Sequence, residues 1–144
     1  MPFEGRQRAA ALDRCWSIYL SLTRAFIVPE EFHVEFPVAV ESVLISGALQ
    51  VTVPIGSDLT LSLREEYVFD RERLTVNRYS YNVIDITGNN VLRADNLPFH
   101  RTDYRRRLLP HPPHHLHDER DRVHSFSGDL DEFIARAQTI LSSR

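Results

Sequence analysis

Two stretches of the chain repeat apolar residues at the three- and four-residue spacing of an amphipathic helix. Over positions 6–27 the apolar residues are Leu12, Cys15, Trp16, Tyr19, Leu22 and Phe26. Over positions 129–142 they are Leu130, Phe133, Ile134, Ala137, Ile140 and Leu141. Pro29 ends the first stretch, and acidic residues in the first turn of the second suit the helix dipole. The pattern therefore predicts helices over 6–27 and 129–142.

The region between them, positions 32–96, alternates apolar and polar residues with the period of two that is typical of strands. Leu59, Leu61 and Leu63 give the clearest alternation, and Thr87-Gly88-Asn89-Asn90 is a strong hairpin turn. Short links between successive strands favour an antiparallel meander. We predict an α+β fold in a single domain over 1–144, with one antiparallel sheet of roughly four to five strands and both helices packed on one face.

After Asn96 the alternation stops, and we expect an irregular segment over 97–126. Four prolines interrupt it, at positions 98, 110, 112 and 113. Six of the chain's seven histidines lie between His100 and His124, and three of them fall within Pro113-His114-His115-Leu116-His117. Imidazole exchanges protons near neutral pH and also ligates metals, so this segment is the candidate centre of chemistry.

Three interpretations of these histidines stay open at this point. Two of His114, His115 and His117 are candidate general acid and base. The same three are candidate ligands of zinc or another transition metal, with Asp95, Asp118 or Glu65 as a further ligand, although no standard zinc spacing is matched. The third interpretation is a polar loop whose histidines only form hydrogen bonds. In an extended stretch His115 and His117 point to the same side.

Other residues near this segment suit contacts with a phosphate or with RNA. Arg93 is a candidate phosphate ligand, and Asp95 or Glu65 is a candidate to orient a histidine. A local basic patch with an aromatic residue suits a single-stranded RNA backbone and a stacked base. Its members are Tyr104, Arg105, Arg106 and Arg107. Tyr81 and Asn96 complete the set of candidate substrate contacts.

The composition of the chain limits which kinds of partner and site we expect. The 144 residues carry a net charge of −3, and all 17 basic residues are arginine, so no overall basic field recruits nucleic acid and any contact must be local. The single cysteine, Cys15, excludes an internal disulfide and a multi-thiol zinc site. No apolar run approaches the ~20 residues of a membrane span, and no signal peptide is evident. We expect a cytoplasmic protein without membrane contact; a homo-oligomer is compatible with the sequence.

Several motifs together resemble the TumE-like family of toxins from prokaryotic toxin–antitoxin pairs. They are Gly56-Ser57, Arg64-Glu65, Tyr79-Ser80-Tyr81, Asp85, Gly88, Arg93, Asp95-Asn96, Pro98, His100 and Pro113-His114-His115-Leu116-His117. The chain departs from the family pattern at Asn82, Ala94, Phe99 and Leu116, where the family usually has histidine, an aromatic residue, histidine and lysine. The resemblance implies a small toxin encoded beside a helix-turn-helix antitoxin.

The leading hypothesis is a toxin that acts as a metal-independent endoribonuclease without a cofactor. One of His114, His115 and His117 would deprotonate the ribose 2′-hydroxyl, and His100 would protonate the leaving 5′-oxygen. Arg93 and Arg105–Arg107 would stabilise the charged phosphate, while Asp95 or Glu65 orients the base. A second hypothesis is a metal-dependent nuclease or nucleotidyl-transfer enzyme with the same histidines as ligands. A third is a non-catalytic module that binds a partner protein.

Overall fold

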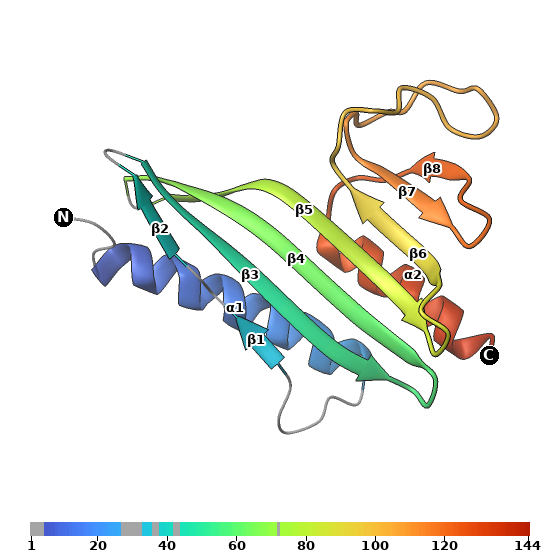
Figure 1. The fold of residues 1–144 in the computed structure, drawn as a ribbon, viewed down its shortest axis with the longest axis horizontal. Helices are drawn as coiled ribbons and strands as arrows, with labels where there is room; N and C mark the ends of the chain where they lie inside the picture. Colours follow the sequence, from blue (N-terminus) through green and yellow to red (C-terminus); the bar gives the residue numbers. More distant parts are fainter. Residues whose placement is uncertain (1–4, 27–32, 36–37, 42–43, 72) are drawn as a thin grey trace.

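The computed structural model describes residues 5–26, 33–35, 38–41, 44–71 and 73–144. These residues form two helices and an eight-stranded sheet (Figure 1). In chain order the elements are α1 (Gly5–Ala25), β1 (His33–Glu35), β2 (Val38–Glu41), β3 (Leu44–Ile55), β4 (Leu59–Asp70), β5 (Arg73–Asp85), β6 (Asn90–Asp95), β7 (His115–Asp118), β8 (Val123–Ser125) and α2 (Leu130–Ser142).

The sheet is an antiparallel meander in the order β1-β3-β4-β5-β6-β7-β8. Two short strands share the outer edge of β3: β1 pairs with positions 50–52, and β2 pairs with positions 44–47. The three long strands β3, β4 and β5 run side by side, and β6, β7 and β8 continue the sheet beyond β5 (Figure 1).

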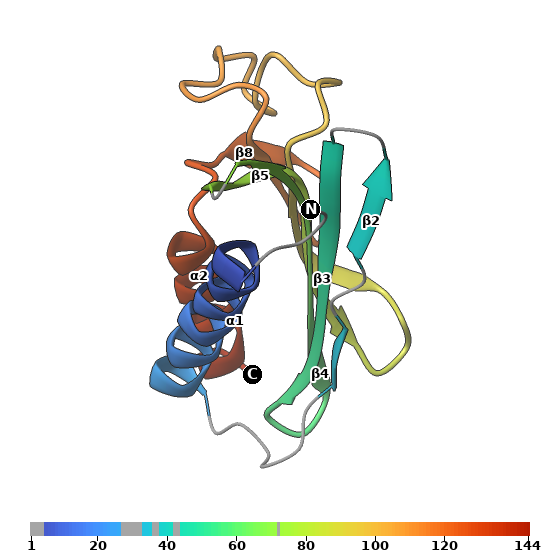
Figure 2. The ribbon, with the colours of Figure 1, turned by 90° about the vertical axis from the view of Figure 1, so that its left-hand side faces the viewer.

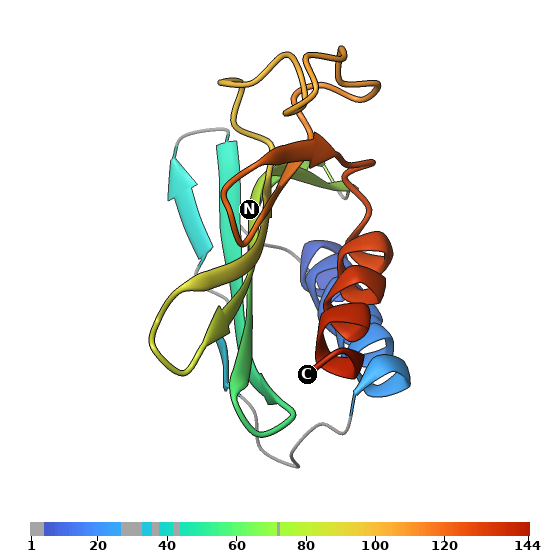
Figure 3. The same cartoon turned by 90° about the vertical axis from the view of Figure 1, so that its right-hand side faces the viewer.

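Both helices cover the same face of this sheet, as Figures 2 and 3 show from opposite sides. The alternation along β4 explains why: Leu59, Leu61 and Leu63 are buried, while the residues between them are partly exposed. Ile18 and Leu22 of α1 and Phe133 and Ala137 of α2 are buried in the same core, together with apolar residues of β3–β7. The prediction of an α+β fold with both helices on one face is confirmed.

The predicted strand count of four to five is wrong. The prediction of irregular structure over 97–126 is also wrong for the second half of that segment. Positions 115–118 and 123–125 form β7 and β8, which add a hairpin to the sheet. The prolines that suggested irregular structure all precede β7. The segment over 97–114 has no named strand, but it carries one isolated bridge between Thr102 and Leu108.

The helix predictions hold with small differences. Helix α1 spans Gly5–Ala25, and the predicted end at 27 and predicted sheet start at 32 lie outside the described residues. Leu12 and Trp16 were expected on the buried face of α1, but their side chains are 68% and 60% exposed. Helix α2 starts after Asp129, whose carboxylate accepts a hydrogen bond from the Asp131 N–H and so caps the helix.

Within the described residues, neither helix has the length and apolar character that a membrane crossing requires.

Candidate functional site

The pairing of β6 with β7 decides which side chains reach each face of the sheet. Ala94 lies opposite Leu116, and both are buried in the core under the helices. Because successive residues of a strand point to opposite faces, their neighbours lie on the face that the helices leave uncovered. These neighbours pair as Arg93 with His117 and Asp95 with His115. The uncovered face therefore carries two histidines, one arginine and one carboxylate side by side.

His100, from the segment after β6, joins His115 and His117 to form a group of three imidazoles that we term the histidine cluster. The ring centroids are 4.7 Å apart for His100 and His115, 5.1 Å for His100 and His117, and 4.9 Å for His115 and His117. One nitrogen from each ring lies within 4.8 Å of the others. The expectation that His115 and His117 share a side is thus confirmed.

His115 is held by oxygen atoms on both sides of its ring. Its Nδ1 lies 2.9 Å from the carbonyl oxygen of Pro113, which can only accept a hydrogen bond, so Nδ1 carries the proton. Its Nε2 lies 3.3 Å from Oδ1 of Asp95. The side chain is only 2% exposed. The structure therefore brings Asp95 to a histidine, in the orienting position that the sequence suggested.

His117 is buried, and its two ring nitrogens lack a complete set of hydrogen-bond partners among the described residues. Its Nδ1 lies 2.9 Å from Oδ1 of Asp121 in the β7–β8 turn, but neither ring nitrogen forms a well-directed hydrogen bond within the described residues. Burial, followed by the charge of Arg93, lowers the pKa of His117 below its usual value. A neutral imidazole has a free lone pair on one nitrogen, which makes His117 available to a ligand.

Arg93 stands beside the cluster with its hydrogen-bonding capacity largely unused. It forms ion pairs with Asp95 at 3.8 Å and with Asp121 at 3.7 Å, but both distances exceed hydrogen-bond length. Its Nε is buried and has no hydrogen-bond partner among the described residues. The side chain is 36% exposed, so solvent or a ligand can reach this guanidinium.

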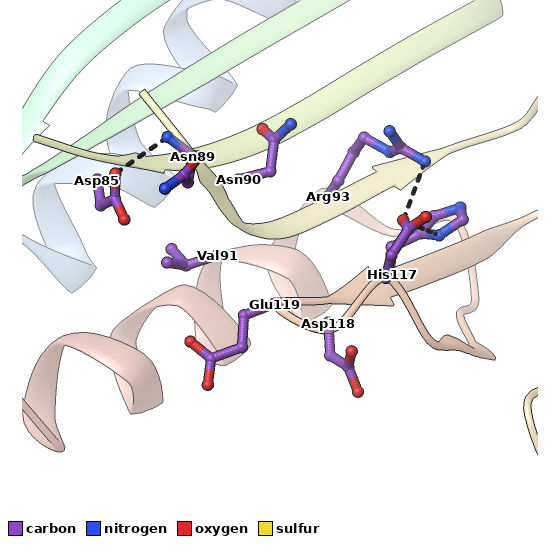
Figure 4. A pocket seen from close by; sticks show the side chains of 9 residues that line it. Asp85, Asn89, Asn90, Val91, Arg93, His117, Asp118 and Glu119 are labelled. Atoms are coloured by element: carbon purple, nitrogen blue, oxygen red, sulfur yellow. Dashed lines mark hydrogen bonds and ion pairs between the residues drawn. The ribbon is translucent and has the colours of Figure 1, made fainter. Parts of the chain in front are cut away.

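A cleft of about 480 Å³ opens beside Arg93 and His117 (Figure 4). Its remaining wall is mainly polar and rich in carboxylates, formed by Asp85, Asn89, Asn90, Val91, Asp118, Glu119 and Asp121. Asp118 is already engaged, because it accepts hydrogen bonds from Arg122 and lies 2.8 Å from His124 Nε2; these contacts hold its pKa far below the usual range. The acidic wall favours cations over anions on this side of the cluster.

His114 does not belong to the cluster, although it is adjacent to His115. Its Nδ1 lies 2.7 Å from the hydroxyl oxygen of Tyr79, and the two rings stack at 5.6 Å. Tyr79 is buried on the helix-covered face, so His114 points away from the uncovered face. Gly128 packs so closely on this ring that a Cβ there would lie 2.7 Å from it. The structure therefore separates His114 from the other two histidines of the predicted set.

Glu65 and Tyr81 also lie on the helix-covered face, away from the cluster. The Glu65 carboxylate is 1% exposed and accepts hydrogen bonds from Arg14 Nε at 2.7 Å, Tyr67 at 2.7 Å and Tyr81 at 2.5 Å. Burial alone would raise the pKa of Glu65, but Arg14 and the two hydroxyls outweigh it and lower the pKa. These residues form a closed polar group beneath α1, which we term the Glu65 cluster, and they are out of reach of a substrate.

The remaining candidate substrate contacts lie outside the cluster. Asn96 bridges backbone groups of β5, accepting from the Tyr79 N–H and donating to the Asn77 carbonyl. Tyr104 is 40% exposed and lies under the guanidinium groups of Arg105 and Arg122. Arg105, Arg106 and Arg107 are all exposed. The described contacts give Asn96 a structural role and leave the arginines at the surface.

Sequence reasoning missed two charged residues that the structure places at these clusters. Asp121 reaches His117 from a turn in which its own φ is +61°, and no sequence pattern marks that turn. Arg14 reaches Glu65 from α1. The sequence signal for Arg14 was its position directly before Cys15, one of the apolar positions of the predicted helix.

Comparison with known proteins does not identify the chain: no family model, no curated protein and no solved structure matches it. The resemblance to the TumE-like family stays a prediction from the sequence motifs.

Proposed function

We propose that the protein is an enzyme that cleaves RNA phosphodiester bonds at the histidine cluster. The observation that carries the proposal is the convergence of three imidazoles with an under-coordinated arginine on the uncovered sheet face. Phosphoryl transfer needs a cation for the phosphate and groups that move protons or hold the attacking oxygen. Arg93 and the histidine cluster provide both kinds of group within one small area.

Arg93 is assigned to the phosphate. Its guanidinium has donors that no carboxylate satisfies at hydrogen-bond distance, and a phosphate oxygen accepts two such donors at once. In the cleavage step the 2′-oxygen attacks phosphorus, the bond to the 5′-oxygen breaks, and the 2′-proton passes to a basic group at the cluster. A proton then returns to the 5′-oxygen, so the first product is a 2′,3′-cyclic phosphate.

His100 is the histidine that a substrate reaches first. His115 and His117 are almost fully buried, whereas His100 is partly exposed and its neighbours Phe99 and Arg101 are exposed. An exposed aromatic ring beside a basic residue suits an unpaired base and its phosphate. The carboxylates around the cleft that Arg93 and His117 line repel a polyanion, so RNA is expected to reach Arg93 from the His100 side of the cluster.

The resemblance to TumE-like toxins supplies a biological context for this chemistry. It implies that the RNA is cellular, that the enzyme acts in the cytoplasm, and that a helix-turn-helix antitoxin binds and silences it. The proposal drops His114, Glu65 and Tyr81 from the predicted site because each faces the helices.

The test is a cleavage assay on single-stranded and total RNA with the purified full-length protein. Wild type should produce fragments ending in 2′,3′-cyclic phosphate, and His100→Ala should lose this activity. His111→Ala is the matched control, because His111 is an exposed histidine of the same segment that lies outside the cluster. Cleavage that survives in His100→Ala, or no cleavage by wild type of any RNA, would overturn the proposal.

A further inference from the structure

We infer that the histidine cluster binds one divalent transition-metal ion, of the zinc class, through His100, His115 and His117. The inference deepens the proposed function by naming the cofactor of the same site, and its link to catalysis rests on that function. It differs from the set suggested by the sequence, because His100 replaces His114 as the third ligand.

The two buried histidines already have the orientation that metal ligands use. In metal sites the ring nitrogen that does not bind the ion commonly faces a carbonyl or carboxylate oxygen, which fixes the tautomer and the ring. Nδ1 of His115 faces the Pro113 carbonyl at 2.9 Å, and Nδ1 of His117 faces the Asp121 carboxylate at 2.9 Å. In both rings Nε2 is then the atom left to bind an ion.

Asp95 places a negative charge beside the proposed ion. Nδ1 of His115 faces the Pro113 carbonyl, so Nε2 is the ring nitrogen on the side of Asp95, 3.3 Å from its Oδ1. An ion bound to Nε2 therefore lies next to a buried carboxylate, which balances part of its charge.

His117 gives the second, independent sign of a missing partner. A buried polar atom without a hydrogen bond costs roughly 1–3 kcal/mol, and Nε2 of His117 is such an atom within the described residues. An ion bound at Nε2 removes this cost at the atom that Asp121 does not face.

The number and type of ligands indicate which ions fit. Imidazole suits zinc, copper, nickel and iron, whereas calcium and magnesium prefer oxygen. Three protein ligands with a fourth position open to water is the arrangement of catalytic zinc sites. Such an ion lowers the pKa of bound water to about 7, which would supply the basic group that the proposed cleavage needs.

The decisive experiment measures metal binding without reference to RNA cleavage. Full-length protein is stripped with EDTA, dialysed, titrated with zinc chloride by calorimetry, and assayed for bound zinc after gel filtration. We expect about one zinc ion per chain, and cobalt should give the visible absorption bands of a four-coordinate site. His100→Gln should weaken zinc binding at least about tenfold.

His100 is the informative position because it is partly exposed, so its substitution leaves the buried strands intact. Matched controls are His114→Gln and His111→Gln, which should bind zinc like wild type, with circular dichroism confirming the fold of each variant. No saturable binding by wild type, or equal affinity in His100→Gln, would overturn the inference. Zinc binding without RNA cleavage would support the metal site and count against the ribonuclease. Cleavage by the metal-free protein in EDTA would support the ribonuclease and overturn the role of the ion in its reaction.

Discussion

Two buried polar clusters in the described part of the chain lie on opposite faces of the same sheet and differ in how many of their polar atoms have hydrogen-bond partners. In the Glu65 cluster, the carboxylate accepts hydrogen bonds from one arginine and two tyrosines. In the histidine cluster, Nε of Arg93 and both nitrogens of His117 have no hydrogen-bond partner among the described residues. A closed set of partners indicates a structural role, whereas an open set indicates a ligand that the protein binds.

The strongest test of this contrast is Glu65→Ala, which should destabilise the fold by about 3 kcal/mol. Removing one partner of a buried ion pair leaves the other charge uncompensated and typically costs about 3–5 kcal/mol; the Arg14 side chain is 27% exposed, which places the effect at the lower end. Urea unfolding measures the change. Glu66→Ala, at the adjacent exposed carboxylate, should change stability by under about 0.5 kcal/mol. Similar losses in both variants would refute the structural role.

On the other face, Arg93→Gln should lower RNA cleavage by about 10²-fold with little change in stability. Removing one donor that stabilises a developing charge costs about 10²–10³ in rate. Arg64→Gln is the control, because Arg64 is an exposed arginine of β4 that pairs with Glu66. Initial rates at saturating RNA would be compared, and equal rates in both variants would show that Arg93 has no part in the reaction.

The Glu65 cluster should also make stability fall in acid. The pKa of Glu65 is lowered in the folded protein from its ordinary value of 4.5. Its contribution is therefore complete above pH 4.5 and is lost as the pH falls through the lower folded pKa. Urea unfolding of wild type and Glu65→Gln at several pH values below 5 should show the steeper decline in wild type. Parallel curves for the two proteins would contradict this assignment.

Two glycines test whether His114 is structural. Gly128 and Gly88 have φ values of +88° and +86°, but a Cβ would meet the His114 ring at 2.7 Å only at Gly128. Each alanine variant should lose about 1 kcal/mol from backbone strain, and Gly128→Ala should lose more because of the added clash. Zinc binding should be retained in both. Equal thermal stability of the two variants would show that the His114 ring moves aside without cost and has no structural role.

The smallest expected effect concerns His117→Leu, which should change the free energy of unfolding by less than about 1 kcal/mol. Replacing unsatisfied buried polar atoms by an apolar group of similar size is often neutral or stabilising. Activity and zinc binding should nevertheless be lost. A destabilisation as large as that of Glu65→Ala would mean that both clusters are structural, and the comparison between them would fail.

The sequence predicts the scaffold of this protein better than its site. Helices, the long meander and the single helix-covered face follow from apolar periodicity, because burial on one face imposes it. The β7–β8 hairpin was missed because four prolines and a high density of charge mask two short strands.

The site was predicted only in part, because some of its contacts depend on an irregular segment and on strand pairing. Alternation along an extended stretch is enough to place His115 and His117 on one side, but it does not locate His100, which reaches them from a segment without regular structure. Arg93 and Asp95 join them through the β6–β7 register, which the sequence does not reveal. Glu65 lies two residues beyond Leu63 in the alternation of β4, and Tyr81 pairs with Leu63, so both lie on the helix-covered face.

All members of the histidine cluster, with Arg93, Asp95 and Asp121, come from one continuous stretch between positions 93 and 121, whereas the hydrophobic core draws on both ends of the chain. Opening of β7 and β8 alone would therefore dismantle the cluster while the long strands stay folded. The lifetime of a bound ion should follow this local opening, which hydrogen exchange of the β7 amides reports, rather than global unfolding.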